Sequence, residues 1–339
     1  MTWIHRRALI ATAAALGLSA AAAARAHTGW HARAPLPWAV QEIYAAVWQD
    51  RIAMAGGLKA TRGQPLHIED RVGLYDPAAD VWAEGPRLPA PRHHPMMVAA
   101  DGTLWAIGGY GRSEAGEWTN ATEVWSLTPG TPAWTPGPAL PAPQAEAVGL
   151  SHGGRVHLVT GRSPGAAANA GWNDQADVDR HQVLADGRWE TARPCPMARN
   201  SAAGAVLDGA LWIAGGRTVS GGGTGRLDRY DPIADRWDTL APLPPSPTGQ
   251  QVGGGLAMAA LGGRLVAFGG EWFAPGSGGV FAETWIYDPA RDAWTRGPDM
   301  PTPRHGLAAA VMGDEVYAIA GGDIVSGGNA TGVVESFRL

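Results

Sequence analysis

Short apolar runs recur along the chain in pairs, and a tight polar turn separates the two runs of each pair. "MMVAADGTLWAIGG" from Met96 and "AMAALGGRLVAFGG" from Ala257 are two examples. Asp-Gly and Gly-Gly turns accept the positive φ angles of a two-residue hairpin. The pattern therefore predicts pairs of antiparallel strands, and no helical period accompanies it.

The hairpins belong to a repeat of about 53 residues, which two independent landmarks define six times. One landmark is a tryptophan that opens a proline-rich phrase such as "WAEGPRLPAPRHH", and the other is a glycine that closes the second strand. The tryptophans are Trp30, Trp82, Trp134, Trp189, Trp237 and Trp294, and the glycines are Gly57, Gly109, Gly161, Gly216, Gly270 and Gly322. Six units of similar length predict a repeat architecture.

A third strand follows in phrases such as "VGLYDP" and "ETWIYDP", where Asp-Pro ends the pairing, and the repeat tryptophan lies on a fourth strand. Six units of four antiparallel strands predict an all-β fold, a six-bladed β-propeller. We expect the tryptophan to fill the wedge between neighbouring sheets, and the prolines to stiffen the path from the rim back to the axis.

The two ends of the repeat complete each other. The last unit ends in "VVESFRL" without a tryptophan strand, whereas "WHARAPLP" from Trp30 has no blade before it. Pairing the two closes the ring and removes two exposed sheet edges. We therefore expect one propeller domain over 27–339, with blades at roughly 38–89, 90–141, 142–196, 197–244, 245–301 and 302–339 plus 27–37.

These features resemble the kelch repeat. The resemblance rests on the diglycines, the spaced tryptophans and the pairs Tyr75-Asp76, Tyr230-Asp231 and Tyr287-Asp288, and it covers nearly all of the chain after the leader. The third unit departs from the pattern, with Thr160 in place of the first glycine and "DVDRHQVL" where the tyrosine is expected.

Residues 1–26 resemble an export signal. Arg6 and Arg7 precede an alanine-rich apolar stretch, and Ala24-Arg25-Ala26 has the form of a cleavage site. Paired arginines favour the twin-arginine type and thus a periplasmic or secreted protein, and the alternative is an uncleaved membrane anchor. No other segment is apolar enough to span a membrane.

Charge and cysteine content exclude two further classes. The chain has 26 Lys and Arg against 31 Asp and Glu, and loss of three arginines with the leader changes the net charge from -5 to -8. No basic surplus is present to bind nucleic acid. The lone Cys195 excludes an internal disulfide framework.

Alternating strand directions place the connections between blades on the same face as the loops that join the second and third strands of each blade. These loops are long and irregular in sequence, at 58–70, 110–121, 162–176, 217–226, 271–282 and 323–331, whereas the hairpin turns on the other face are minimal. Function in a repeat fold usually lies where such insertions gather.

Polar residues follow each proline phrase where the chain reaches the axis, and we expect them to converge around the mouth of the channel. They are Gln41, Glu42, Arg92, His93, His94, Gln144, Glu146, Arg199, Asn200, Gln250, Gln251, Arg304 and His305, joined after the glycines by Arg162, Arg217, Glu271 and Asp323. Such a ring is suited to a polyhydroxyl or anionic small molecule. The alternative is that the arginines only tie one loop to the next.

Four tryptophans outside the repeat fall on this face: Trp38, Trp118, Trp172 and Trp272. An indole can stack against a sugar ring or anchor a protein partner, and the alternative is that it knits the loops together. The predicted ligand-binding set is Glu42, Arg92, His93, Arg162, Arg199, Arg217, Gln250, Glu271, Arg304, His305, Trp118, Trp172 and Trp272.

Catalytic signals are sparse. The chain has no G-x-S-x-G elbow and no P-loop, and "SGGGTG" at 220–225 indicates a flexible loop. The candidates for a catalytic role are Glu271, Glu146, His93 and His305. His93, His94 and His305 with a glutamate could bind a metal, but adjacent histidines point to opposite sides of an extended chain, so we expect no metal or cofactor.

Three hypotheses about function follow. The first is a module that binds a glycan, a sugar acid or an envelope protein. The second is a sugar isomerase: a resemblance to the sialic-acid mutarotases implies a glutamate followed by an arginine, and "GGEWFAPGSGG" offers Glu271 and Pro275-Gly276 but has Gly278 near where the arginine is expected.

The third hypothesis is a copper enzyme, because galactose-oxidase relatives also have kelch propellers. Their pattern implies a cysteine cross-linked to a tyrosine, for which Cys195 and Tyr110 with His93, His94 and His305 are available. Cys195 lies in a proline phrase, and the chain lacks the additional domains of such oxidases. We therefore favour this hypothesis least.

Overall fold

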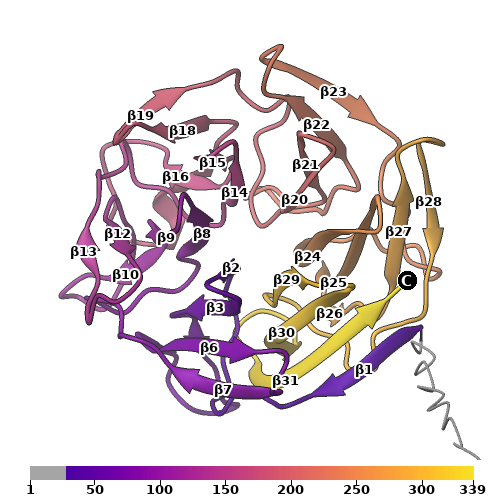
Figure 1. The fold of residues 1–339 in the computed structure, drawn as a ribbon, viewed down its shortest axis with the longest axis horizontal. Coiled ribbons are helices and arrows are strands. Elements are labelled where there is room, and N and C mark those ends of the chain that lie inside the picture. The colour runs from indigo at the N-terminus through magenta and orange to yellow at the C-terminus, as the bar shows by residue number, and fades with distance from the viewer. Residues whose placement is uncertain (1–27) are drawn as a thin grey trace, which may run out of the picture.

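The computed structural model describes residues 28–339, which form a ring of six blades around a central channel (Figure 1). Each blade is a sheet of four antiparallel strands, and the strand that opens each unit lies nearest the axis. The only helix among the described residues is a short 3-10 turn, η1 (Trp172–Asp174). The predicted fold class is confirmed. The predicted export signal lies outside the described residues.

The strands of each blade can be followed from the axis outward. The first three blades are β2 (Ala45–Trp48), β3 (Arg51–Ala55), β6 (Val72–Asp76) and β7 (Val81–Glu84); β8 (Met96–Ala100), β9 (Thr103–Ile107), β12 (Val124–Leu127) and β13 (Thr135–Pro136); β14 (Val148–His152), β15 (Arg155–Val159), β18 (His181–Ala185) and β19 (Arg188–Thr191). The last three are β20 (Ala203–Leu207), β21 (Ala210–Ala214), β22 (Leu227–Asp231) and β23 (Arg236–Leu240); β24 (Gly254–Leu261), β25 (Arg264–Ala274), β27 (Thr284–Asp288) and β28 (Ala293–Arg296); β29 (Ala308–Met312), β30 (Glu315–Ile324), β31 (Asn329–Arg338) and β1 (Gly29–Arg33).

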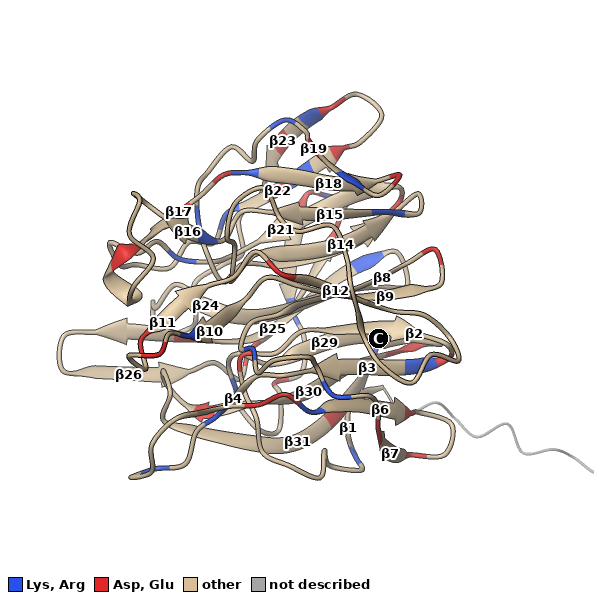
Figure 2. Cartoon of the chain, turned by 90° about the vertical axis from the view of Figure 1, so that its left-hand side faces the viewer, with Lys and Arg blue, Asp and Glu red and all other residues tan. Residues whose placement is uncertain are grey.

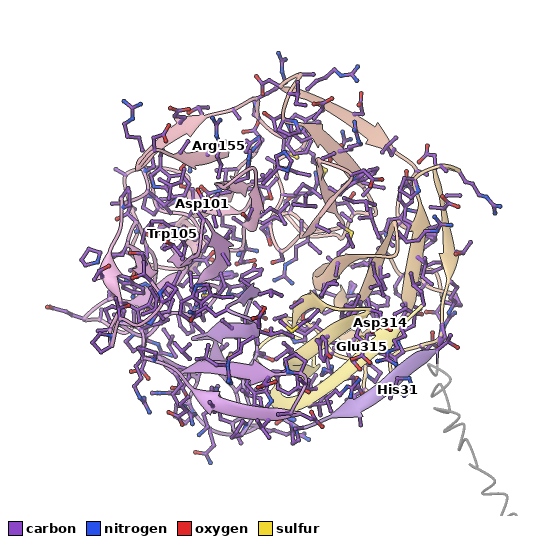
Figure 3. The ribbon with its side chains drawn as sticks, viewed as in Figure 1. His31, Asp101, Trp105, Arg155, Asp314 and Glu315 are labelled. Carbon is purple, nitrogen blue, oxygen red and sulfur yellow. The ribbon has the colours of Figure 1, made fainter. Side chains whose placement is uncertain are left out.

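The two ends of the described chain close the ring, as the sequence predicted. β1 pairs antiparallel with β31, with Trp30 opposite Phe337 and His31 opposite Ser336. Arg33 forms an ion pair of 2.5 Å with Glu315 on β30, and Figure 3 shows His31 and Glu315 within the same blade. The last blade therefore contains strands from both ends.

The repeat tryptophans join each blade to its neighbour by hydrogen bonds as well as by packing. Each indole N–H donates to a backbone carbonyl of the preceding proline phrase. The pairs are Trp82 with Ala34 (2.9 Å), Trp134 with Pro86 (2.8 Å), Trp189 with Pro138 (2.8 Å), Trp237 with Arg193 (2.9 Å), Trp294 with Ala241 (2.9 Å) and Trp30 with Pro298 (3.1 Å). The proline phrase thus presents an acceptor at a fixed place in every unit.

In three blades the kelch tyrosine strengthens this junction. The hydroxyl of Tyr230 donates to Asp235 (2.7 Å), and the same carboxylate oxygen accepts the backbone N–H of Arg193 (2.9 Å). Because Trp237 binds the carbonyl of Arg193, both backbone groups of one residue are held by the next blade. This explains why tyrosine, aspartate and tryptophan recur together.

The connections between the second and third strands are more ordered than the sequence suggested. Most fold into small hairpins that stand on one side of the ring, and Figure 2 shows several of them projecting to the left. They are β4 (Leu58–Lys59) with β5 (His67–Ile68), β10 (Tyr110–Arg112) with β11 (Trp118–Asn120), β16 (Arg162–Pro164) with β17 (Gln175–Asp177), β25 with β26 (Ser277–Val280), and the extended ends of β30 and β31.

The last glycine landmark has to be corrected by one residue. In the fifth unit the two glycines have φ of 67° and 102°, and in the sixth unit Ala320 and Gly321 have the matching φ of 53° and 100°. Gly322 instead takes the place of the residue that follows the pair. We placed the landmark on Gly322 because the sequence shows two consecutive glycines there. What repeats in the structure is the left-handed backbone conformation, which alanine adopts at position 320.

Removing β1 should open the ring. A chain that begins at Ala34 leaves the edge of β31 unpaired, so we expect a melting temperature lower by about 10 °C or more and self-association through the open edge. Circular dichroism and size-exclusion chromatography measure both effects. A chain that begins at Gly29 is the control and should melt like the full chain. Equal melting of the two shortened chains would contradict the closing role of β1.

Candidate functional site

Six residues, one from each unit, surround the channel at equivalent positions and form what we call the inner ring. They are Glu42, His94, Glu146, Ser201, Gly255 and Gly306, with left-handed φ values between 51° and 65°. For a residue other than glycine this conformation costs about 1–2 kcal/mol. Residues in such strained conformations cluster at functional sites, so four of them in one ring point to a candidate site here.

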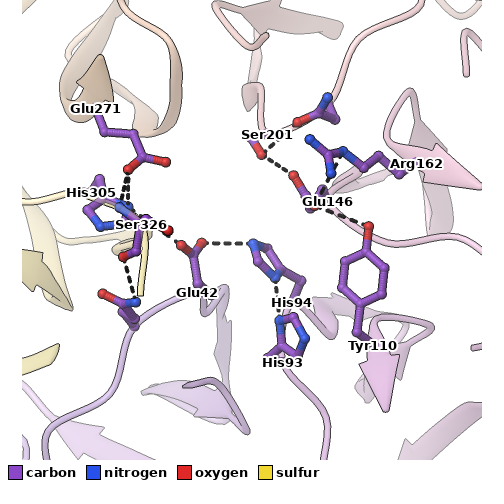
Figure 4. A network of polar contacts seen from close by, with 12 residues as sticks. Glu42, His93, His94, Tyr110, Glu146, Arg162, Ser201, Glu271, His305 and Ser326 are labelled. Carbon is purple, nitrogen blue, oxygen red and sulfur yellow. Dashed lines mark hydrogen bonds and ion pairs between the residues drawn. The ribbon is translucent and has the colours of Figure 1, made fainter. Parts of the chain in front are cut away.

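Backbone hydrogen bonds between neighbours hold this conformation. Five bonds run from N–H to carbonyl: His94 to Glu42 (2.9 Å), Glu42 to Gly306 (2.7 Å), Gly306 to Gly255 (2.8 Å), Gly255 to Ser201 (3.1 Å) and Ser201 to Glu146 (3.0 Å). We call these bonds the backbone belt. As a result, the inner-ring side chains gather at the mouth of the channel (Figure 4).

A second set of side chains comes from the residues that follow the glycine pairs. Tyr110 is bridged to His93, Arg162 to Ala145 and Arg217 to Asn200, in each case to the residue before an inner-ring position. Glu271 occupies the equivalent place opposite Gly254. We call Tyr110, Arg162, Arg217 and Glu271 the outer ring.

Glu146 is completely buried but fully surrounded by donors. Its Oε1 accepts the Tyr110 hydroxyl (3.1 Å) and lies 3.5 Å from Arg162 Nε. Its Oε2 accepts the Ser201 hydroxyl and lies 3.9 Å from Arg217. Burial alone would raise the pKa of Glu146, but Arg162 and the other neighbouring cations hold it below the usual value. Glu146 therefore acts as a fixed negative charge that orients the surrounding donors.

Glu42, His94 and His93 form a chain of contacts. Glu42 Oε2 lies 2.7 Å from His94 Nε2, and His94 Nδ1 lies 2.9 Å from His93 Nδ1. Burial opposes the charge on both partners, yet their attraction raises the pKa of His94 and holds that of Glu42 well below normal. Burial, and then the charge of His94, lowers the pKa of His93. We therefore assign an imidazolium to His94, which donates to a neutral His93.

Glu271 and His305 complete the opposite side of the mouth. Glu271 accepts from Arg217 Nη1 (2.5 Å) and from the backbone N–H of Ser326 (2.7 Å), so both its oxygens are engaged. His305 Nδ1 lies 3.5 Å from Glu271 Oε2 and from Glu42 Oε1, while its Nε2 donates to the carbonyl of Ile324. Oε1 of Glu42 is thus the least engaged carboxylate oxygen at the mouth.

A cavity of about 660 Å³ opens above these groups. Arg162 forms part of its wall: the guanidinium stacks on the Trp172 ring at 4.2 Å and is only 5% exposed. Its Nε has no hydrogen-bond partner among the described residues. A guanidinium in a cavity wall has the charge and the planar set of donors that suit a carboxylate or phosphate group.

The structure brings many of the predicted site residues together around this cavity. Those in its lining are Glu42, His93, His94, Arg162, Arg217, Gln250, Gln251, Glu271, Trp118, Trp172 and Trp272. Glu146 and His305 lie buried beside them. Sequence reasoning missed Ser201, Ser326, Leu66 and Phe273, of which Ser201 could have been found from its register after Arg199-Asn200.

Three predicted arginines do not reach the mouth. Arg92, Arg199 and Arg304 instead form ion pairs inside their blades with Glu123 (3.2 Å), Asp228 (2.8 Å) and Glu335 (2.8 Å). Each stands two residues before an inner-ring position and meets an acidic residue of its own unit. The predicted ligand-binding role and the alternative of a tie between loops both differ from this geometry, in which each arginine pairs within its own blade.

Five other predicted residues also lie outside the lining. Gln41, Gln144 and Asn200 are buried, and their side-chain amides donate to the Ser326 carbonyl, the Thr160 carbonyl and the Asp177 carboxylate, respectively. Trp38 is buried, with the Arg71 guanidinium 4.5 Å above its ring. Asp323 is exposed and accepts a hydrogen bond from Asn329 (2.9 Å).

The geometry disfavours the copper hypothesis. Cys195 is buried with its sulfur 3.6 Å from Arg199, and burial raises the pKa of its thiol to about 11. Tyr110 is bonded to Glu146 at the mouth. Across residues 28–339, no three His, Cys, Asp or Glu side chains are grouped so that they could hold a metal ion.

Comparison with known proteins agrees with the repeat and the fold. A model of the Kelch motif matches residues 198–244 and 253–301. Together with the six blades and their tyrosine and tryptophan junctions, this identifies the chain as a kelch-repeat β-propeller.

Relatives at the level of sequence are kelch-like proteins. Kelch-like protein terF of Aspergillus terreus is 28% identical over 88% of this chain, and Kelch-like protein 34 of Homo sapiens is 30% identical over 75%. The chain spans 64% and 38% of the lengths of these relatives. Among solved structures, that of YjhT aligns with a TM-score of 0.73 and 17% identity over 88% of this chain and 95% of its own, which shows a shared fold.

Among residues 28–339, no helix has the length and apolar character needed to cross a membrane.

Replacing Glu42 by Gln should lower the pKa of His94, because the attraction that raises it is lost while burial remains. The ion pair stabilises the fold most between about pH 4.5 and 6.5. Below this range the unfolded chain takes up a proton that Glu42 in the fold accepts only near its depressed pKa, and above it the unfolded chain releases a proton that His94 in the fold keeps until its raised pKa. Within the range we expect a loss of about 3 kcal/mol.

Urea unfolding across pH and NMR titration of the imidazoles test this expectation. Glu190→Gln, at an exposed position on β19, is the control. A stability difference that stays constant from pH 4 to 9 would show that Glu42 and His94 are not coupled.

Proposed function

We propose that the cavity at the channel mouth binds a small carbohydrate that carries an acidic group. The observation that carries this proposal is Arg162, whose guanidinium lies in the cavity lining, stacked on Trp172 and with its Nε toward Glu146. A carboxylate satisfies such a fork with two parallel hydrogen bonds. The neighbouring Glu146 cannot do so, since it lies at 3.5 Å and is shared among several donors.

The rest of the cavity suits a sugar ring. Trp118, Trp172 and Trp272 in its lining supply indole rings, a residue type that packs against the apolar face of a sugar. Glu42 Oε1 can accept hydrogen bonds from hydroxyl groups, and Gln250 can both donate and accept. A volume of about 660 Å³ lies within the usual range for small-ligand sites, roughly 300–1,000 Å³.

Arg162→Met should weaken binding of sugar acids by about 30-fold or more while leaving neutral sugars unaffected, because methionine covers Trp172 but offers no donor. Isothermal titration calorimetry with matched pairs of sugars and sugar acids measures this difference. Arg71→Met is the control, since Arg71 also stacks on a tryptophan, Trp38, but lies outside the cavity. If both variants lose the same affinity for sugar acids, Arg162 does not bind the acidic group.

A second candidate is isomerisation of the bound sugar, to which the resemblance to sialic-acid mutarotases also points. It is favoured by the contact of 2.7 Å between Glu42 and His94, which puts a carboxylate beside an imidazolium in the cavity lining, with the other carboxylate oxygen 3.5 Å from His305. A base and an acid held together can move a proton off a hydroxyl and return one to a ring oxygen. Glu271 is less suited, since Arg217 and Ser326 engage both of its oxygens.

Under this candidate the protein should accelerate exchange between the anomers of a bound sugar acid, and His94→Gln should slow that exchange at least 10-fold with little change in affinity. Saturation-transfer NMR measures the exchange and calorimetry the affinity. An exchange rate equal to that of the free sugar, despite tight binding, leaves a binding protein rather than an enzyme.

We further propose that the protein is exported, to the periplasm or outside the cell. The support is the sequence of residues 1–26, with Arg6 and Arg7 before an apolar stretch. A protein partner on the loop face stays a prediction.

A further inference from the structure

The cavity has two chemically different zones. The exposure of the lining residues shows that one zone is deep and the other is close to the solvent. The charged groups lie at the bottom: Arg162 and Glu271 are 5% and 1% exposed. Toward the solvent the lining becomes apolar, with Trp172 and Phe273 at 40% and 54% exposure and Leu66 half-buried. Exposed apolar side chains on one concave surface indicate a binding site for an apolar group.

Four loop segments supply this apolar rim. Leu66 precedes β5, Trp118 begins β11, Trp172 begins η1, and Trp272 with Phe273 lie on β25 near its turn to β26. These hairpins stand on the side of the ring that Figure 2 shows at the left. The rim therefore comes from connections outside the repeat core, where the blades do not require apolar residues.

Contacts between the hairpins hold the rim in place. Arg112 donates to the carbonyl of Leu66 (2.9 Å), which ties β10 to the loop before β5. The Asn169 side chain donates to the carbonyl of Asn120 (2.8 Å) and accepts its backbone N–H (3.0 Å), which ties β11 to the loop before η1. A rim that is already formed costs little ordering free energy when a ligand binds.

A free sugar acid does not account for this rim. Its carboxylate and hydroxyl groups match the charged bottom of the cavity, and a single ring there leaves Leu66 and Phe273 in contact with water. A ligand that extends upward with an apolar group removes this surface from water and gains affinity in proportion to the area covered.

We propose that the natural ligand is amphiphilic: a sugar-acid head held by Arg162 at the bottom and an apolar aglycone, aromatic or alkyl, packed against the rim formed by Leu66, Trp118, Trp172, Trp272 and Phe273. This inference rests on the proposed function and narrows it to acidic glycosides. The rim then determines which aglycones are accepted, and the bottom determines the head group.

Calorimetry with three kinds of probe tests this. The probes are free hexuronic acids and N-acetylneuraminic acid, the 4-nitrophenyl glycosides of the same acids, and the 4-nitrophenyl glycosides of the neutral hexoses. We expect the acidic aryl glycosides to bind at least 10-fold more tightly than either other group. Phe273→Ser should remove most of this advantage over the free acids. Ile233→Ser, at a residue that is 97% exposed and outside the cavity lining, should leave it unchanged.

The outcomes separate the two proposals. Free acids that bind as tightly as their aryl glycosides overturn the amphiphilic ligand and leave the acidic carbohydrate standing. If neutral aryl glycosides bind as tightly as acidic ones, the proposed recognition of an acidic group is wrong, and only the binding of an apolar group by the rim is supported. If no probe binds, both proposals fail. The melting temperature of Phe273→Ser should match that of the native chain, because Phe273 is half-exposed on a hairpin.

Discussion

The backbone belt is the constraint on which the site depends. Hydrogen bonds between blades hold the inner ring in a left-handed conformation, which brings its side chains to the channel mouth. Gly306 is needed for this, since a Cβ there would lie 2.7 Å from Glu42 Cδ, and one at Gly255 would lie 2.9 Å from the backbone nitrogen of Gly306. The space that Gly306 leaves is occupied by the Glu42 carboxylate, which turns toward His94.

Charge pairing is the second condition, because the groups at the mouth are almost entirely buried. An isolated buried charge would lose several kcal/mol of solvation. Here each carboxylate meets a cation: Glu42 meets His94, Glu146 meets Arg162, and Glu271 meets Arg217. Arg162 is the member whose pairing is incomplete, since its contact with Glu146 is 3.5 Å long. An anionic ligand would complete the network without requiring any pair to break.

The sequence predicted the fold and the ring closure because both follow from repeated patterns, the tryptophans and the hairpin turns, whose physical cause is local. It also predicted which face holds the cavity. It did not predict the direction of Arg199, which depends on an acidic residue 29 positions later, Asp228. It also did not predict that Gly322 lies one residue past the landmark position. In this unit Ala320 adopts the left-handed conformation that glycine has at the same position in the fifth unit. Contacts across the repeat, rather than local patterns, decide both.

The repeat fixes the backbone conformation at six equivalent positions, but the residues at these positions differ. The backbone belt uses only backbone atoms, so four of its positions carry different side chains, whereas close contacts require glycine at Gly255 and Gly306. The same is true of the hairpins beyond the glycine pairs, where Trp172 and Phe273 arise without altering a blade. The chemistry of the mouth and the character of the rim can therefore change independently. In a protein built in this way, the charged groups at the mouth can stay the same while the apolar residues of the rim change.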